Sequence, residues 1–245
     1  MTPDFGVAGR VAVVTGGSSG LGEAMARALV AGGARVVSLS RRPAEWCDGQ
    51  SAVALSADLS DPGTMADVAT RAAEPFGAPD ILINAAGINT RQKADDVTAE
   101  GWKVTIDLNL SSPFFLAQAL VPAMKAKGWG RIVNVASLQS YRAFAGGIAY
   151  GASKGGIAQL TRAMAEAWSP HGITANALAP GFFPTALTGP VFGDETLAAH
   201  HAAMTCIGRN GRLEDIAGPA LFLCSPASDY VTGQILPVDG GYTAK

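Results

Sequence analysis

The sequence is poor in the residues that build metal centres and disulfide frameworks. Its 245 residues include only three cysteines and three histidines. Cys47, Cys206 and Cys224 are far apart, and they have neither a metal-ligand spacing nor the dense pattern of a small disulfide-stabilised protein. We therefore expect no metal site. Unpaired cysteines also fit the reducing conditions of the cytoplasm, where we expect the protein to reside.

Charge is scarce as well, and it is nearly balanced. Charged residues make up 16% of the chain and the formal net charge is −2, so nothing indicates a nucleic acid or an anionic membrane as partner. Residues 1–9 lack the basic start and apolar run of a secretory signal. No apolar stretch reaches the ~20 residues of a membrane span. We therefore expect neither a nucleic acid nor a membrane as partner.

No linker rich in proline or serine, charge block or repeat divides the chain. Strand and helix patterns alternate along its length, and 48% of the residues are hydrophobic, enough for a large core. The pattern predicts an α/β fold: a single doubly wound Rossmann-type domain over residues 1–245, with a seven-stranded parallel sheet and helices on both faces. Strands are predicted at 10–15, 35–40, 52–56, 80–84, 131–136, 173–178 and 234–238, and helices at 20–31, 62–74, 98–107, 112–127, 150–168 and 213–224, with a shorter helical excursion within 185–204.

The first predicted strand leads into a glycine-rich turn and then into a helix. Glycine lets the backbone turn tightly and approach a phosphate, and the helix N-terminus beyond it offers free N–H groups and a positive dipole end. Strand, turn and helix in this order predict a site for the diphosphate of a dinucleotide. The expected contacts are Gly16, Ser18, Ser19, Gly20, Leu21 and Gly22.

Tyr150 and Lys154 lie four residues apart in a predicted helix, so their side chains leave one face, a turn apart. A phenol has a pKa of ~10, too high for a general base at neutral pH, and a nearby ammonium favours the phenolate. An isolated pair of this kind is more often a buried tyrosine beside a solvated lysine. In company with the glycine-rich turn, it indicates an activated tyrosine.

The ordered set of motifs resembles the short-chain dehydrogenase/reductase family from about Gly9 to Tyr242. The glycines follow the pattern TGxxxGxG, and after them come Asn84-Ala85-Ala86-Gly87, Asn109, Ser137, the Tyr150–Lys154 pair, Pro180-Gly181 with Thr185, and Val238-Asp239-Gly240-Gly241. The resemblance implies an NAD(P)-dependent alcohol dehydrogenase or ketoreductase whose catalytic tetrad is Asn109, Ser137, Tyr150 and Lys154. Tyr150 would exchange a proton with the substrate oxygen, and Lys154 would lower the Tyr150 pKa. Ser137 would donate to the substrate carbonyl, and Asn109 would hold a water.

The end of the second predicted strand bears on the choice of cofactor. Family members that use NAD usually carry an aspartate there for the ribose 2′-hydroxyl, whereas this chain has Ser40 followed by Arg41 and Arg42. A hydroxyl and a guanidinium would accept a 2′-phosphate, so NADP(H) is favoured over NAD(H). The resemblance implies further contacts from Asp58 and Leu59 at the adenine, from Asn84, Ala85, Ala86 and Gly87 near the ribose, and from Pro180, Gly181, Phe183 and Thr185 at the nicotinamide, beside Tyr150 and Lys154.

The substrate is the least specified part of the sequence. A predicted lid at about 182–204 would close over the nicotinamide and exclude water. Residues 87–91 and 227–233 resemble the gluconate 5-dehydrogenase group, which predicts a sugar acid or polyol. A 3-oxoacyl-thioester reductase or a general carbonyl reductase stays open as an alternative, and a non-catalytic dinucleotide sensor is disfavoured by the complete tetrad. Candidate substrate contacts are Asn89, Arg91, Gln139 and Arg142, and an arginine there could clamp a carboxylate.

Small residues on the predicted helix 150–168 permit close helix–helix approach. The resemblance implies that this helix and the 112–127 helix pack across a two-fold axis, and that the C-terminal segment packs across another. A homotetramer is the expected assembly. Purely internal packing of the small residues is the alternative.

Overall fold

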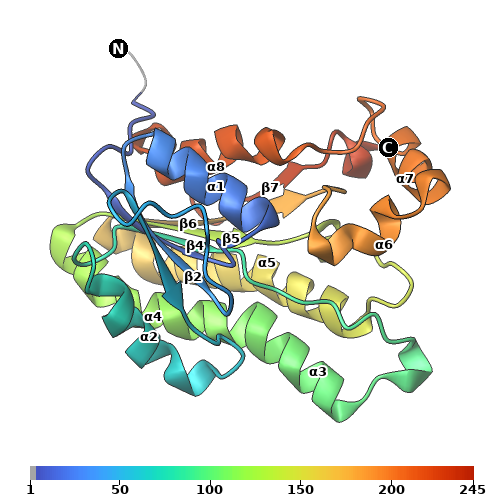
Figure 1. Cartoon of the computed structure of the whole chain (residues 1–245), viewed down its shortest axis with the longest axis horizontal. Coiled ribbons are helices and arrows are strands. Elements are labelled where there is room, and N and C mark those ends of the chain that lie inside the picture. The colour runs from blue at the N-terminus through green and yellow to red at the C-terminus, as the bar shows by residue number, and fades with distance from the viewer. Residues whose placement is uncertain (1–3) are drawn as a thin grey trace.

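The computed structural model describes residues 4–245 and contains a seven-stranded parallel sheet between two layers of helices (Figure 1). The strand order is β3-β2-β1-β4-β5-β6-β7, and every neighbouring pair runs parallel. The direction of winding reverses between β1 and β4, which is where sheets of this kind bind their ligands. The predicted fold class is confirmed.

The strands lie where the sequence placed them, within a residue or two at each end. Strands β1, β4 and β6 are buried along their whole length because helices cover both faces of the sheet, and this is why apolar residues dominate their sequences. Thr174 and Asn176 of β6 are buried polar exceptions. The bounds are β1 (Val11–Thr15), β2 (Arg35–Ser40), β3 (Ala52–Ser56), β4 (Ile81–Asn84), β5 (Gly130–Val135), β6 (Ile173–Pro180) and β7 (Ile235–Val238).

Two large apolar cores, one on each face, hold the helices on the sheet, and a smaller third cluster lies around Ile157 of α5. Met25 of α1 and Leu223 of α8 belong to the core on one face, and Leu116 of α4 and Met164 of α5 to the core on the other. Figure 1 shows α1 and α8 together on one side of the sheet and α2, α4 and α5 on the opposite side. The helices are α1 (Gly20–Ala31), α2 (Met65–Ala73), α3 (Ala99–Ile106), α4 (Ser112–Lys127), α5 (Ile148–Trp168), α6 (Gly189–Phe192), α7 (Glu195–Ala203) and α8 (Ala217–Cys224).

Helices α3 and α4 form one continuous helix, although the sequence predicted a break between them. A π-helical turn, Asp107–Ser111, joins them. The combined helix Ala99–Lys127 is long and apolar enough to span a membrane by length and composition alone, which corrects the expectation that no stretch would be. Its α4 half packs against α2 and the sheet and its α3 half against α5, so this helix is part of the packed fold.

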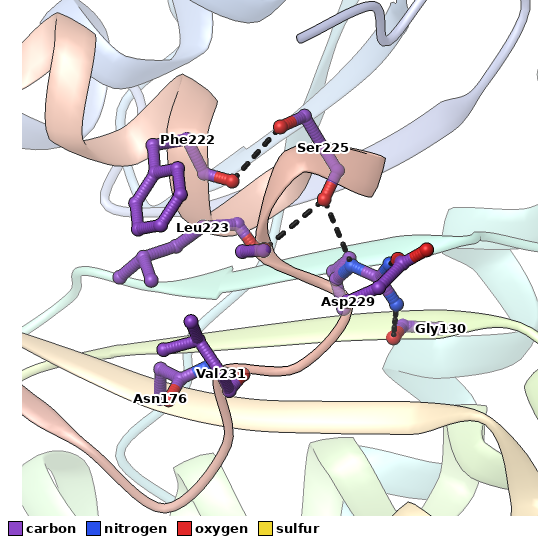
Figure 2. Close-up of polar contacts among 9 residues, drawn as sticks. Gly130, Asn176, Phe222, Leu223, Ser225, Asp229 and Val231 are labelled. Carbon is purple, nitrogen blue, oxygen red and sulfur yellow. Dashed lines mark hydrogen bonds and ion pairs between the residues drawn. The ribbon is translucent and has the colours of Figure 1, made fainter. Parts of the chain in front are cut away.

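The segment between α8 and β7 anchors the end of the sheet opposite the predicted site (Figure 2). Asn176 Nδ2 of β6 donates to Val231 O at 2.8 Å. Arg131, the second residue of β5, is 1% exposed and forms an ion pair with Asp229. Residues 227–233, one of the two segments that resembled the gluconate 5-dehydrogenase group, therefore stabilise the fold and do not line the site.

Candidate active site

The carboxyl ends of four neighbouring strands bring the predicted motifs to one edge of the sheet. Thr15 ends β1, Asn84 ends β4, Ser137 follows β5 and Pro180 ends β6. Because these strands are parallel and adjacent, their ends meet although the residues are far apart in the sequence.

Glycine is required at two points of the turn after β1. A Cβ on Gly22 would overlap Gly16 O, and a Cβ on Gly16, whose φ is +68°, would lie 3.0 Å from the Ala86 backbone. Thr15 Oγ1 accepts hydrogen bonds from the N–H groups of Ala85 and Ala86, each at 3.0 Å, and so ties the turn to the segment after β4. The N-cap side chain of α1 makes no capping bond, so the first-turn N–H groups are left for an anion. This bare cradle fits a dinucleotide diphosphate.

The end of β2 faces the same turn. Ser40 is buried, and its hydroxyl accepts the Ser18 N–H at 3.2 Å. Both arginines that follow are exposed. Hydrogen bonds from Ser60 lower the pKa of Asp58, after β3, and the Arg41 guanidinium adds to that effect. The structure therefore brings together the serine, the arginine and the aspartate expected around the adenosine half of a cofactor.

Tyr150 and Lys154 leave one face of α5, as their spacing predicted, and both side chains are buried. Lys154 Nζ lies 5.6 Å from the centroid of the Tyr150 ring and donates to Val135 O, the last carbonyl of β5, at 2.5 Å. Ser137 begins the short turn that follows β5, and its hydroxyl accepts the Gln139 N–H at 3.1 Å. The three side chains expected to act on a substrate thus come from one strand end and one helix face.

Burial controls the protonation of this pair. It lowers the pKa of Lys154 from 10.5 to about 8 and raises the pKa of Tyr150. The Ser137 side chain, and then the Arg91 guanidinium, oppose the rise at Tyr150. The expectation that Lys154 would lower the Tyr150 pKa is therefore wrong for this structure. Low-dielectric surroundings disfavour both charged forms, and the ammonium is bonded to a carbonyl instead of the phenol.

Asn109 lies in the π-helical turn and is 1% exposed. Its Oδ1 accepts the Ile88 N–H at 2.9 Å, and its Nδ2 donates to Ile88 O at 2.9 Å and to Ser153 Oγ at 3.1 Å. The side chain therefore fixes the segment after β4 against α5. Both ends of the Asn109 amide already have protein partners. If this residue holds a water, as the sequence predicted, the water would therefore bind to the backbone of the π-helical turn and not to the Asn109 side chain.

Arg91 spans the mouth of the site. Its Nη2 donates to Leu187 O, in the predicted lid, at 2.7 Å, and its charge acts on the Tyr150 phenol. Asn89 Oδ1 accepts the Arg91 N–H at 3.0 Å. The Arg91 backbone has a φ of +52°, the one positive value at a non-glycine residue within the described part of the chain. Strain of this kind persists where the surroundings impose it, often beside ligands.

Arg142 and Gln139, the other two mouth candidates, are placed differently. The Arg142 guanidinium lies 5.5 Å from the Tyr242 ring centroid and is directed at the C-terminal segment. Gln139 lies against Gly147 and Gly151, on the helix face that also carries the tyrosine and the lysine, and its Oε1 is buried without a hydrogen-bond partner. Of the two arginines, Arg91 is therefore the one near the reacting groups.

The predicted lid is helical, as expected, and it docks on the C-terminal segment. Phe182 stacks on His201 of α7 with ring centroids 3.7 Å apart, and His201 Nδ1 lies 3.3 Å from the Tyr242 hydroxyl. No local pattern in the sequence shows that these three distant segments meet at His201, which is buried. Phe183, expected at the cofactor, turns its ring into the core, so it could face a nicotinamide only through its backbone.

The remaining cofactor candidates divide into side-chain and backbone positions. Asn84 is buried, and its Nδ2 donates to Asn134 Oδ1 at 2.9 Å, so its side chain supports the sheet. Leu59 is buried in the core. Thr185 lies over the glycine-rich turn, since a Cβ on Gly20 would lie 3.1 Å from the threonine methyl. The other candidates lie at the same edge of the sheet, where β4 and β6 end: Ala85, Ala86 and Gly87 follow β4, Pro180 ends β6, and Gly181 follows it.

A cavity of about 290 Å³, which sequence reasoning missed, lies beside the Gly181–Phe183 segment and the end of β7. Its wall includes Arg209 and Asp215, which form an ion pair at 2.6 Å. None of the four expected catalytic residues lines it. It therefore adjoins the catalytic residues at the Gly181–Phe183 segment without including them.

The site has the character of a nicotinamide-dependent oxidoreductase, and comparison with known proteins identifies the family. The chain belongs to the short-chain dehydrogenase/reductase family: a model of the family described as enoyl-(acyl carrier protein) reductase matches residues 16–243. The enzyme acts on CH–OH groups.

Relatives of the chain include sugar-acid dehydrogenases. It is 39% identical to the 2-dehydro-3-deoxy-D-gluconate 5-dehydrogenase of Bacillus subtilis, over 98% of this chain and 97% of the relative. It is also 39% identical to the gluconate 5-dehydrogenase of Gluconobacter oxydans, over 98% of each. The gluconate 5-dehydrogenase of Burkholderia cenocepacia, solved with NADP and tartrate, has a TM-score of 0.93 at 35% identity over 98% of both chains.

Proposed function

We propose that the protein is an NADP(H)-dependent oxidoreductase that interconverts a secondary alcohol and a ketone on a sugar acid, as a gluconate 5-dehydrogenase does. Arg91 carries this proposal. Its guanidinium lies between the lid and Tyr150, where it can bind the carboxylate of a short acid whose carbonyl lies at Tyr150 and Ser137. The names of the Bacillus and Gluconobacter relatives agree with such a substrate.

The four tetrad residues divide the work of proton transfer. When bound, the nicotinamide supplies or accepts the hydride. Tyr150 gives its phenol proton to the carbonyl oxygen during reduction, and its raised pKa keeps that proton in place until then. Ser137 donates a second hydrogen bond to the same oxygen. Lys154 replaces the proton on Tyr150, and Asn109 holds the segment after β4 in place.

The preference for NADP(H) rests on the geometry at the end of β2. Because Ser40 Oγ already accepts the Ser18 N–H, its own proton is free to donate to a 2′-phosphate. Arg41 and Arg42 are exposed beside it and supply positive charge. The NADP bound in the Burkholderia relative supports this choice.

A second candidate, reduction of a 3-oxoacyl thioester, is favoured by the aromatic side chains at the mouth. Phe144 and Phe182 pack edge to face with centroids 6.1 Å apart, and they offer an apolar surface to an acyl chain. This alternative needs no carboxylate clamp, so Arg91 distinguishes the two.

The test is NADPH oxidation with 5-keto-D-gluconate and with an acetoacetyl thioester, measured for the wild type, Arg91→Leu and Arg142→Leu. Loss of a charge-assisted bond costs about 1.5–3 kcal/mol, so we expect kcat/KM of Arg91→Leu for the keto acid to fall about 10- to 150-fold. Arg142→Leu is the matched control and should retain activity. Turnover of the thioester alone, or equal loss in both variants, would contradict the proposal.

We also propose that residues 1–245 act as one domain with a lid at 182–204, and that four copies assemble in the cytoplasm. Two aromatic side chains of the α3–α4 helix, Trp102 and Phe115, are each 42% exposed, and a Cβ on Gly155 of α5 would meet open space. These features suit close packing of α4 and α5 across a two-fold axis. Measurement of the molar mass in solution tests the tetramer.

A further inference from the structure

One peptide of the glycine-rich turn is held at one end by the last residue of β2 and at the other by the segment that follows β2. The carbonyl of this peptide, Gly17 O, accepts a hydrogen bond from Trp46 Nε1 at 2.8 Å. Its N–H, on Ser18, donates to Ser40 Oγ at 3.2 Å. Because a peptide group is planar and its C=O and N–H point in opposite directions, two bonds at opposite ends fix its rotation.

The Trp46 ring packs beside α1, and the loop beyond it is ordered by Asp48. The Arg27 guanidinium of α1 lies 5.1 Å from its ring centroid, and Arg27 is paired with Glu23 at 2.7 Å. Just beyond Trp46, Asp48 Oδ1 accepts the N–H groups of Ser51 at 2.8 Å and of the next residue at 3.0 Å, which orders the loop before β3. The indole N–H is therefore presented to the turn by a pre-formed loop.

The orientation of this peptide matters for an anionic ligand. A carbonyl that rotated toward a diphosphate would repel it, whereas the N–H groups at the start of α1 attract it. The Trp46 bond holds Gly17 O toward the segment that follows β2.

We propose that Trp46 is a positioning residue for the dinucleotide site, and that it acts by locking the Gly17–Ser18 peptide. This inference rests on the proposed use of a nicotinamide dinucleotide. The turn faces the diphosphate, which NAD(H) and NADP(H) share, so loss of the lock weakens both cofactors equally. Arg41, in contrast, should affect NADP(H) alone.

The experiment compares Trp46→Phe with Trp168→Phe by calorimetric titration of NADPH and of NADH. Phenylalanine retains a ring beside Arg27 and removes the N–H. Trp168, whose ring stacks on Phe114 with centroids 6.4 Å apart, is the matched control. One lost hydrogen bond of about 1–1.5 kcal/mol corresponds to a rise in Kd of about tenfold. We expect that rise for both nucleotides in Trp46→Phe, an unchanged kcat at saturation, and no change in Trp168→Phe.

The possible outcomes separate this inference from the proposed function. A wild type that binds neither nucleotide contradicts the dinucleotide site itself. If the wild type binds and Trp46→Phe binds equally well, or loses affinity for NADPH alone, the locked peptide is not what Trp46 contributes. Should the phenylalanine variant fail to fold, 3-benzothienylalanine introduced at position 46 preserves the shape of indole without its N–H, and the same tenfold rise is expected.

Discussion

Replacement of Lys154 by methionine should make the folded protein more stable at neutral pH while removing its activity. Burial lowers the Lys154 pKa from 10.5 to about 8. At about 1.4 kcal/mol per pKa unit, keeping the ammonium in the folded state costs about 3 kcal/mol at pH 7. Methionine has a similar length and no charge, but it forfeits the bond to Val135 O, worth about 1 kcal/mol. A net gain of about 2 kcal/mol is expected.

The pH dependence follows from the sign of the shift. Between pH 8 and 10.5 the unfolded chain holds a proton on Lys154 that the folded chain has lost, so wild-type stability rises with pH across this window. Below pH 8 both states are protonated and the cost is fully present. By pH 9.5 about 2 kcal/mol of the cost is relieved. The advantage of the methionine variant should therefore nearly vanish between pH 7 and pH 9.5.

The assay is urea unfolding of both proteins at pH 7 and pH 9.5, at one protomer concentration because oligomers gain stability by mass action. Lys103→Met is the control. Lys103 is exposed and its hydrogen bond with Asp107 raises its pKa, so its removal brings no gain at pH 7. The reasoning is refuted if Lys154→Met is less stable at pH 7, or if its difference from the wild type is the same at both pH values.

Two further predictions concern catalysis and cofactor choice. Tyr150→Phe should reduce turnover to below a few per cent of wild type while the Kd for NADPH stays within about twofold, because the phenol proton is lost and the ring remains. Initial rates measure the turnover and calorimetry measures the Kd. Substantial residual turnover would show that Tyr150 is not the proton donor. Ser40→Asp combined with Arg41→Ala should shift the ratio of kcat/KM for NADPH over NADH toward NADH by at least about tenfold, because a carboxylate repels a 2′-phosphate. An unchanged ratio would show that the end of β2 does not select the cofactor.

The fold was predictable because its signals are local. Each buried strand is a short apolar run, and each covering helix has its own periodicity, so the elements could be placed to within a few residues. The junction of α3 and α4 was not predictable in this way. The π-helical turn at Asp107–Ser111 depends on the bonds between Asn109 and the backbone of Ile88, which lies in a different part of the chain.

The candidate site shows the same division. The glycines, Tyr150, Lys154 and Ser40 were found because their types and spacing are tied to the chemistry of phosphates and protons. Trp46 was missed, because nothing near it in the sequence shows that its N–H reaches Gly17 O. The sequence also could not show which of Arg91 and Arg142 lies near the reacting groups. That depends on the neighbour that the fold provides, which is the lid for Arg91 and Tyr242 for Arg142.

The protonation of the Tyr150–Lys154 pair shows why spacing alone misleads. Four residues along a helix put an ammonium near a phenol, and in water that proximity would favour the phenolate. In this fold both groups are also taken out of water, and desolvation acts on each of them separately. It lowers the Lys154 pKa to about 8 and raises the Tyr150 pKa, so the two pKa values move apart. The Lys154 ammonium is then the stronger acid of the two, so transfer of its proton to a Tyr150 phenolate is favourable, and this helps the tyrosine to recover the proton that it gives to the substrate.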